Sequence, residues 1–90
     1  MNKEAFNKAE RLYSTISEQQ YTLKGIRFYE QEHYKAGVPL MLKTPYTTGT
    51  YAVDTDIVIK DKELIKEVLN CIKIYSIKTI QNAEKELENL

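Results

Sequence analysis

The 90-residue chain is poor in the residues that most often carry catalysis. It has one cysteine, one histidine and no tryptophan. A single cysteine cannot form an internal disulfide, and any nucleophile and base pair would have to use His33 as its imidazole. The three glycines are isolated, which excludes a glycine-rich phosphate-binding loop. We therefore expect a protein that is not an enzyme and that uses no cofactor.

An excess of charge of one sign and long apolar runs are also lacking. Basic and acidic residues number 13 each, so the basic excess typical of nucleic-acid-binding proteins is missing. No segment approaches the roughly 18 apolar residues of a membrane span, and the first residues lack the apolar core of a signal peptide. We expect a cytoplasmic protein without membrane contact. Lysine outnumbers arginine 11 to 2, a bias that suggests an AT-rich bacterial or phage genome.

What the chain does contain is helical periodicity in its first third. Apolar residues recur there at spacings of three, four or seven, the pattern of an amphipathic helix, at Ala5, Ala9, Leu12, Ile16, Leu23 and Ile26. Asn2 can cap the first turn. Gly37 can take the left-handed conformation after the last turn, and Pro39 cannot continue a helix. We expect a helix over about residues 3–36, with a kink or a change of partner near Gly25.

A second helix is expected over about residues 61–90, with Asp61 as its N-cap. Its main apolar face comprises Ile65, Leu69, Ile72, Ile80, Ala83, Leu87 and Leu90. At 100° per residue, Ile74 and Ile77 lie roughly 120–180° around the helix from Ile65. One partner helix cannot cover both sides. Cys71 lies among apolar neighbours and is expected to be a small buried hydrophobic residue.

The stretch between the helices, "PLMLKTPYTTGTYAVDTDIVI", reads as a β-hairpin over about residues 38–59. With a loop at 47–50, Tyr46 faces Tyr51, and the same register pairs Leu40 with Ile57. It also pairs Val38 with Ile59 on this apolar face. The opposite face then pairs Met41 with Asp56 and Lys43 with Asp54. The prolines at positions 39 and 45 block one edge, whereas the edge of strand 51–59 is open to a second copy of the chain.

These elements predict an α+β fold in a single domain, residues 1–90. Two long antiparallel helices are connected by a two-stranded β-hairpin, in a homo-oligomer. The order helix, hairpin, helix is similar in outline to the prefoldin-like architecture, and such an outline carries no function by itself.

The leading functional hypothesis is a small non-catalytic protein-binding module of the accessory or inhibitory kind. Tyrosine is enriched at protein interfaces because its ring can be buried while its hydroxyl finds a partner. Tyr46 and Tyr51, near the hairpin tip, are the candidate anchors for another protein. Ile74 and Ile77 are the candidate surface for self-association.

Two alternatives use other chemistry. Basic and aromatic side chains that could hold phosphates and stack on bases alternate in the stretch 24–35, as Lys24, Arg27, Phe28, Tyr34 and Lys35. This makes a nucleotide or nucleic-acid binder the second hypothesis. The third is a two-metal helical bundle, because Glu30 and His33 have Glu-x-x-His spacing and Glu63 or Glu67 would lie at their level on an antiparallel helix. Four-residue patterns are common by chance, so no metal site is expected.

Overall fold

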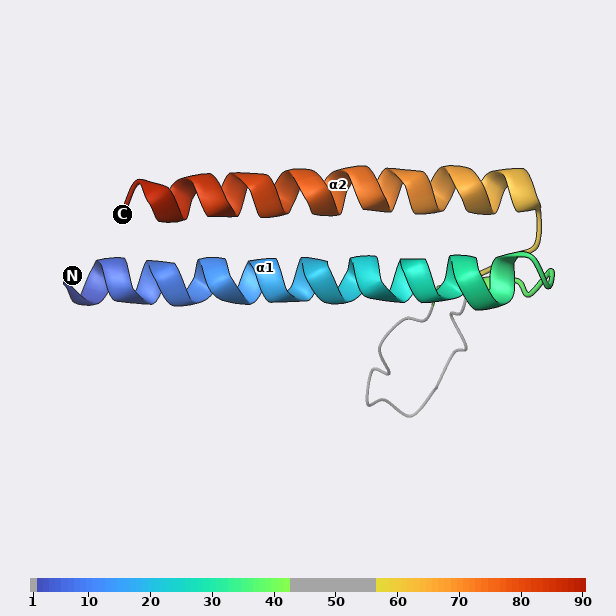
Figure 1. Ribbon diagram of the computed structural model, residues 1–90, viewed down its shortest axis with the longest axis horizontal. Helices are drawn as coiled ribbons and strands as arrows, with labels where there is room; N and C mark the ends of the chain where they lie inside the picture. Colours follow the sequence, from blue (N-terminus) through green and yellow to red (C-terminus); the bar gives the residue numbers. More distant parts are fainter. Residues whose placement is uncertain (1, 43–56) are drawn as a thin grey trace, which may run out of the picture.

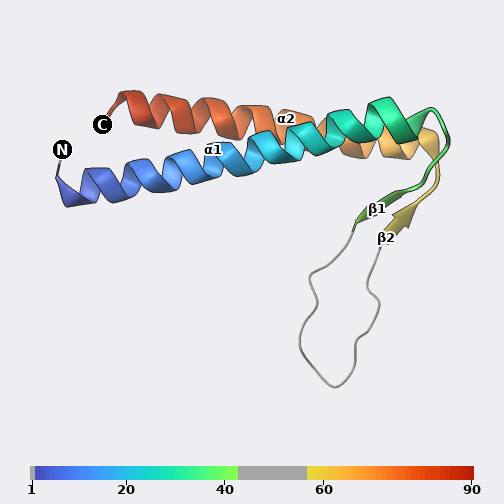
Figure 2. The same ribbon diagram turned by 60° about the horizontal axis from the view of Figure 1, so that its bottom comes forward.

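A computed structural model describes residues 2–42 and 57–90. The chain forms two 27-residue helices, α1 (Lys3–Tyr29) and α2 (Lys62–Glu88), which lie side by side and antiparallel (Figures 1 and 2). A small antiparallel sheet, β1 (Leu40–Leu42) and β2 (Ile57–Ile59), lies between them in the sequence. The predicted order of helix, hairpin and helix is confirmed for these residues.

The first turn of each helix is closed by the predicted N-cap residue. The Oδ1 atom of Asn2 accepts a hydrogen bond from the Ala5 N–H at 2.7 Å, and that of Asp61 accepts one from the Leu64 N–H at 2.9 Å. Both acceptors satisfy backbone N–H groups that have no partner within the helix, which is why asparagine and aspartate are favoured there. These two helix starts follow directly from the sequence.

The end of the first helix is more complex than its sequence predicts. α1 passes through Gly25 without interruption and continues into one π-helical turn, η1 (Glu30–Tyr34). Gly37 then takes a φ of 75°, and its N–H donates to the Tyr34 carbonyl at 3.2 Å. The Val38 N–H donates to the His33 carbonyl at 3.1 Å. These two bonds form a Schellman motif, so Gly37 is the C′ residue, as predicted.

The two helices meet along a seam with the spacing of a coiled coil. On α1 the buried and half-buried residues of the seam follow steps of four and three: Ala5, Ala9, Leu12, Ile16, Gln19, Leu23 and Ile26. On α2, the same steps of four and three connect Ile65, Leu69, Ile72, Ser76, Thr79 and Ala83. Ser76 is fully buried, and its hydroxyl donates to Oε1 of Gln19 at 2.7 Å. The middle of the seam is therefore a hydrogen-bonded polar layer.

The apolar core lies at the end of the seam nearest the sheet. Ile26, Ile65 and Leu69 form its buried centre. Partly buried residues pack around them: Tyr29, Tyr34, Leu40, Ile59 and Ile72. Because Leu40 and Ile59 belong to the two strands, the base of the hairpin is fastened to the helices.

The sheet corrects the predicted register by two residues. Leu40 pairs with Ile59, Met41 with Val58, and Leu42 with Ile57, so the expected pairings of Leu40 with Ile57, Val38 with Ile59 and Met41 with Asp56 are wrong. The reason is that both backbone groups of Val38 already form hydrogen bonds outside the sheet. Its N–H donates to the His33 carbonyl at the helix end, and its carbonyl accepts a hydrogen bond from the Tyr29 hydroxyl. A shift of two residues keeps every side chain on its expected face of the sheet.

One further expectation is wrong. Cys71 is exposed rather than buried. It lies roughly 130° around α2 from the residues that contact α1, so its apolar neighbours in sequence do not cover it. Neither described helix has an apolar stretch long enough to cross a lipid bilayer.

Candidate protein-binding surfaces

The predicted anchors at the hairpin tip, Tyr46 and Tyr51, lie outside the described residues, as do Lys43 and Asp54. Their role stays a prediction. The described part of the sheet is apolar on both faces, and Met41, Leu42, Ile57 and Val58 are exposed.

The predicted pair on the second helix is found on the outer face of α2. Ile74 is 59% exposed and Ile77 is 47% exposed. They are three residues apart and so lie one turn from each other on the same side of the helix. Asn70 and Gln81, four residues before and after the pair, are also exposed. The result is a short aliphatic patch between two amides on a helix face that does not contact α1.

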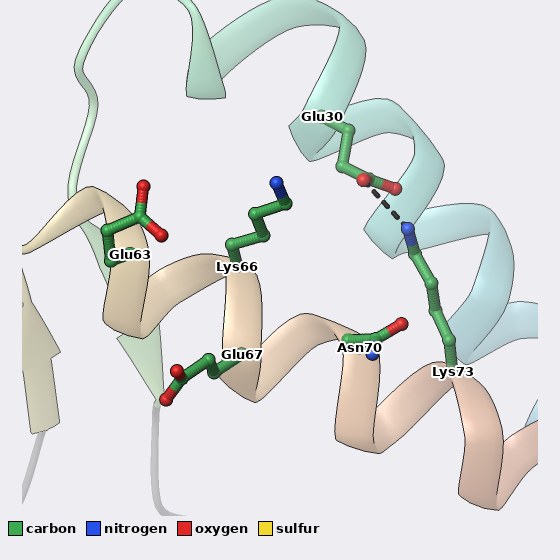
Figure 3. A pocket seen from close by; sticks show the side chains of 6 residues that line it. All are labelled: Glu30, Glu63, Lys66, Glu67, Asn70 and Lys73. Atoms are coloured by element: carbon green, nitrogen blue, oxygen red, sulfur yellow. Dashed lines mark hydrogen bonds and ion pairs between the residues drawn. The ribbon is translucent and has the colours of Figure 1, made fainter.

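A polar pocket adjoins this patch toward the sheet end of the molecule. It is lined by Glu30, Glu63, Lys66, Glu67, Asn70 and Lys73. Figure 3 shows Glu30 reaching across from the first helix to Lys73, while the other four side chains follow α2. The Lys73 ammonium donates to Oε2 of Glu30 at 2.7 Å, and both side chains are more than a third exposed. Such a pocket offers both signs of charge to a polar partner.

The pocket tests the residues of the two-metal hypothesis. It brings Glu30 and Glu67 to one surface, as the antiparallel helices require. His33 is not among its lining residues, because its ring lies 5.5 Å from the ring of Phe28 and 6.1 Å from that of Tyr29. Across residues 2–42 and 57–90, no group of three or more His, Cys, Asp or Glu side chains could hold a metal ion.

The residues of the nucleic-acid hypothesis are only partly brought together. Lys24, Arg27, Phe28 and Lys35 are exposed. Tyr34 instead packs against the apolar core, its hydroxyl 3.4 Å from the Lys62 carbonyl and its ring 5.8 Å from the Lys62 ammonium. A base stacked on Phe28 could not use the Tyr34 ring at the same time without opening the core. This alternative keeps three exposed cationic residues, Lys24, Arg27 and Lys35, and one exposed aromatic ring, Phe28.

Tyr29 joins the sheet end of the first helix to Val38, two residues before β1. Burial first, and the nearby Tyr34 second, raise the pKa of Tyr29 above its ordinary value of 10.0. The Tyr29 hydroxyl donates to the Val38 carbonyl. The neutral Tyr29 hydroxyl therefore helps to hold the segment that leads from the first helix into β1.

α1 also carries an exposed row of aromatic residues that was not predicted from the sequence, which we call the aromatic stripe. Its members are Phe6, Tyr13, Tyr21 and Phe28, with exposures of 55%, 63%, 80% and 58%. Their spacings of seven, eight and seven residues keep them on one side of a helix. The spacing can be read in the sequence, but polar residues separate the rings, and the apolar residues of the seam give a stronger periodic pattern over the same stretch.

No known protein family, characterised protein or solved structure was found to be similar to this chain.

Proposed function

We propose that this chain is a small non-catalytic protein-binding module of the accessory or inhibitory kind, and that it acts as a homo-oligomer. The observation that carries this proposal is the large exposed apolar surface of the described residues, more than half of it on the two helices. Within residues 2–42 and 57–90, five hydrophobic residues are buried: Ala9, Ile26, Ile65, Leu69 and Ala83. Fourteen large hydrophobic residues in the same ranges are at least 37% exposed.

The arrangement of those exposed residues supports association more than their number does. Singly scattered apolar residues are normal on a protein surface, whereas rows and patches mark interaction sites. Each helix here has one helical neighbour, so its opposite side has no packing partner in the described chain. The aromatic stripe of α1 and the Ile74 and Ile77 patch of α2 lie on two such sides.

We assign the outer face of α2 to a different protein. Asn70, Ile74, Ile77 and Gln81 follow steps of four, three and four residues and so form one stripe along α2. An amphipathic helix of another protein can pack along such a stripe. The charged pocket at the end of this row can orient such a helix, because its Lys66 and Glu67 present opposite charges at neighbouring positions. A helical segment of a partner protein, apolar on one side and charged at one end, fits this face.

The test uses the double variant Ile74→Ser with Ile77→Ser, and Tyr75→Ser as a matched control. Tyr75 is 65% exposed on another side of the same helix. Its replacement by serine therefore removes a comparable apolar surface and leaves the patch unchanged. Both variants should keep the helical circular dichroism of the native chain. We expect the double variant to lose proteins captured by the tagged native chain, while Tyr75→Ser retains them.

The hairpin anchors are tested in the same experiment with Tyr46→Ala and Tyr51→Ala combined. Loss of capture in this variant alone would place the partner site at the hairpin and would contradict the assignment to α2. Full capture by all the variants would contradict the proposed function at both surfaces.

A further inference from the structure

The aromatic stripe of α1 lies well away from the helix pair's own seam. At 100° per residue its four rings fall within a sector of about 80°, centred roughly 130° from the residues that contact α2. All four are exposed by more than half. Polar residues separate them along the same side, and these include Glu10, Ser17 and Lys24, all of which are exposed.

The order of residues along this stripe is symmetric about its midpoint. Tyr13 and Tyr21 lie four residues on either side of Ser17, and Phe6 and Phe28 lie eleven residues on either side. If two copies of α1 lie antiparallel with a two-fold axis at Ser17, each tyrosine meets a tyrosine and each phenylalanine meets a phenylalanine. An interface with a two-fold axis requires this kind of self-complementary surface.

The charges on the stripe obey the same symmetry with opposite signs. Glu10 lies seven residues before Ser17 and Lys24 lies seven residues after it. The two-fold axis therefore places Glu10 of each copy opposite Lys24 of the other, twice in one dimer. Because like charges at these positions would repel, the pattern selects this antiparallel register over a parallel one, in which Glu10 meets Glu10.

We infer that a second copy of this chain occupies the aromatic stripe, antiparallel to the first and centred on Ser17. The inference deepens the proposed homo-oligomer by naming its interface, and so rests on the proposed function. The four rings offer about 500 Å² of apolar area per copy, which is more than half of the roughly 800 Å² that each partner contributes to a standard interface.

The patch on α2 does not offer the same symmetry of charge. A two-fold axis between Ile74 and Ile77 would place Glu67 opposite Glu84, and Lys66 opposite Lys85. Like charges directly opposite each other oppose association. The aromatic stripe is thus the better surface for a second copy, and the α2 patch suits a different protein.

The test is a charge exchange, measured by analytical ultracentrifugation at low ionic strength over a range of concentrations. Glu10→Lys places lysine opposite Lys24 twice, and Lys24→Glu places glutamate opposite Glu10 twice. Each variant alone should dimerise about 30-fold more weakly than the native chain, from two exposed pairs that change from attraction to repulsion. Mixing the two variants restores both attractive pairs in a heterodimer, as does combining both changes in one chain.

A second measurement locates the two-fold axis. With Cys71→Ser as background, Ser17→Cys should form a disulfide-linked dimer under mild oxidation, because facing helices at the usual separation bring the two Cα atoms to roughly 5 Å. Ser14→Cys is the matched control. The two copies of residue 14 would lie about 9 Å apart along the axis, beyond disulfide reach.

The outcomes separate this inference from the proposed function. Native-like dimerisation of Glu10→Lys, or equal cross-linking at positions 14 and 17, would overturn the inference. So would a native chain that stays monomeric at all concentrations. Partner capture through Ile74 and Ile77 is scored separately in the same variants. It should persist there, and weaken only for a partner that offers two sites, because the two α2 faces are no longer linked. Capture without the α1 dimer would leave the binding function standing and remove only the interface named here.

Discussion

Replacing Gly37 by alanine should destabilise the chain, although nothing stands in the way of the added methyl group. No other atom lies within 4 Å of the position that a Cβ would take at Gly37. The cost is therefore conformational, because the φ of 75° is unfavourable for any residue with a side chain. We expect a loss of about 1 kcal/mol, which lowers the melting temperature of a domain of this size by about 4–8 °C.

Gly25→Ala is the matched control, and it should have the opposite sign. Gly25 lies in the interior of α1, and a Cβ there also meets no atom within 4 Å. Alanine is about 1 kcal/mol better than glycine inside a helix, so the two variants should differ by about 2 kcal/mol. Thermal unfolding followed by far-ultraviolet circular dichroism measures both, at one protein concentration because association shifts the midpoint. A Gly37→Ala variant as stable as the native chain would refute the left-handed helix cap. A destabilised Gly25→Ala variant would refute an unbroken α1.

Two further predictions concern groups inside the fold. Ser76→Ala removes the hydrogen bond to Gln19, worth about 1 kcal/mol, and gains about 0.5 kcal/mol of helix propensity, so urea unfolding should show a net loss of about 0.5 kcal/mol. Adding Gln19→Leu should recover about 1 kcal/mol by completing the apolar seam, and a further loss would argue against this polar layer. The raised pKa of Tyr29 predicts that stability is complete below pH 10 and falls as the pH rises through the folded-state value, because the unfolded chain releases its proton first. Tyr29→Phe should lose stability less steeply above pH 10, and an equal slope would exclude this tyrosine as the cause.

The two helix starts and the glycine cap could be predicted because the signals for them are local. An N-cap such as Asn2 or Asp61 needs only the N–H of a residue three positions later. The glycine at position 37 needs only a left-handed φ that few other residues tolerate. Each of these requirements involves only four to six consecutive residues. They do not depend on contacts with the rest of the chain.

The strand register could not be predicted because it depends on the helix end. Cross-strand pairing alone allows Val38 to face Ile59, and the apolar pattern is equally good after a shift of two residues. The decision is made by the Schellman motif and the Tyr29 hydroxyl, which use both backbone groups of Val38. The π-helical turn Glu30–Tyr34 determines the position of the helix end. No local sequence pattern predicts this turn.

The polar residues of the seam were not predicted for a different reason. Gln19 and Ser76 occupy heptad positions that are apolar elsewhere in the seam, so the spacing of apolar residues does not identify them. Their hydrogen bond becomes visible only when the two helices are paired. Cys71 shows the reverse error, since its sequence neighbours are apolar but its own position on α2 faces solvent.

The outer faces of the two helices differ in a way that bears on how the chain would work. The stripe of α1 is symmetric about Ser17 in both ring size and charge, which favours a copy of itself. The face of α2 is aliphatic at its middle and charged at one end, and its like charges oppose self-pairing. A dimer through α1 would carry two α2 faces, one on each outer side of a four-helix layer. Two weak contacts to a partner that offers two sites, or to neighbouring copies of it, would then reinforce each other through a raised effective concentration. A chain with so small a core would thereby bind more tightly than either of its short apolar patches allows alone.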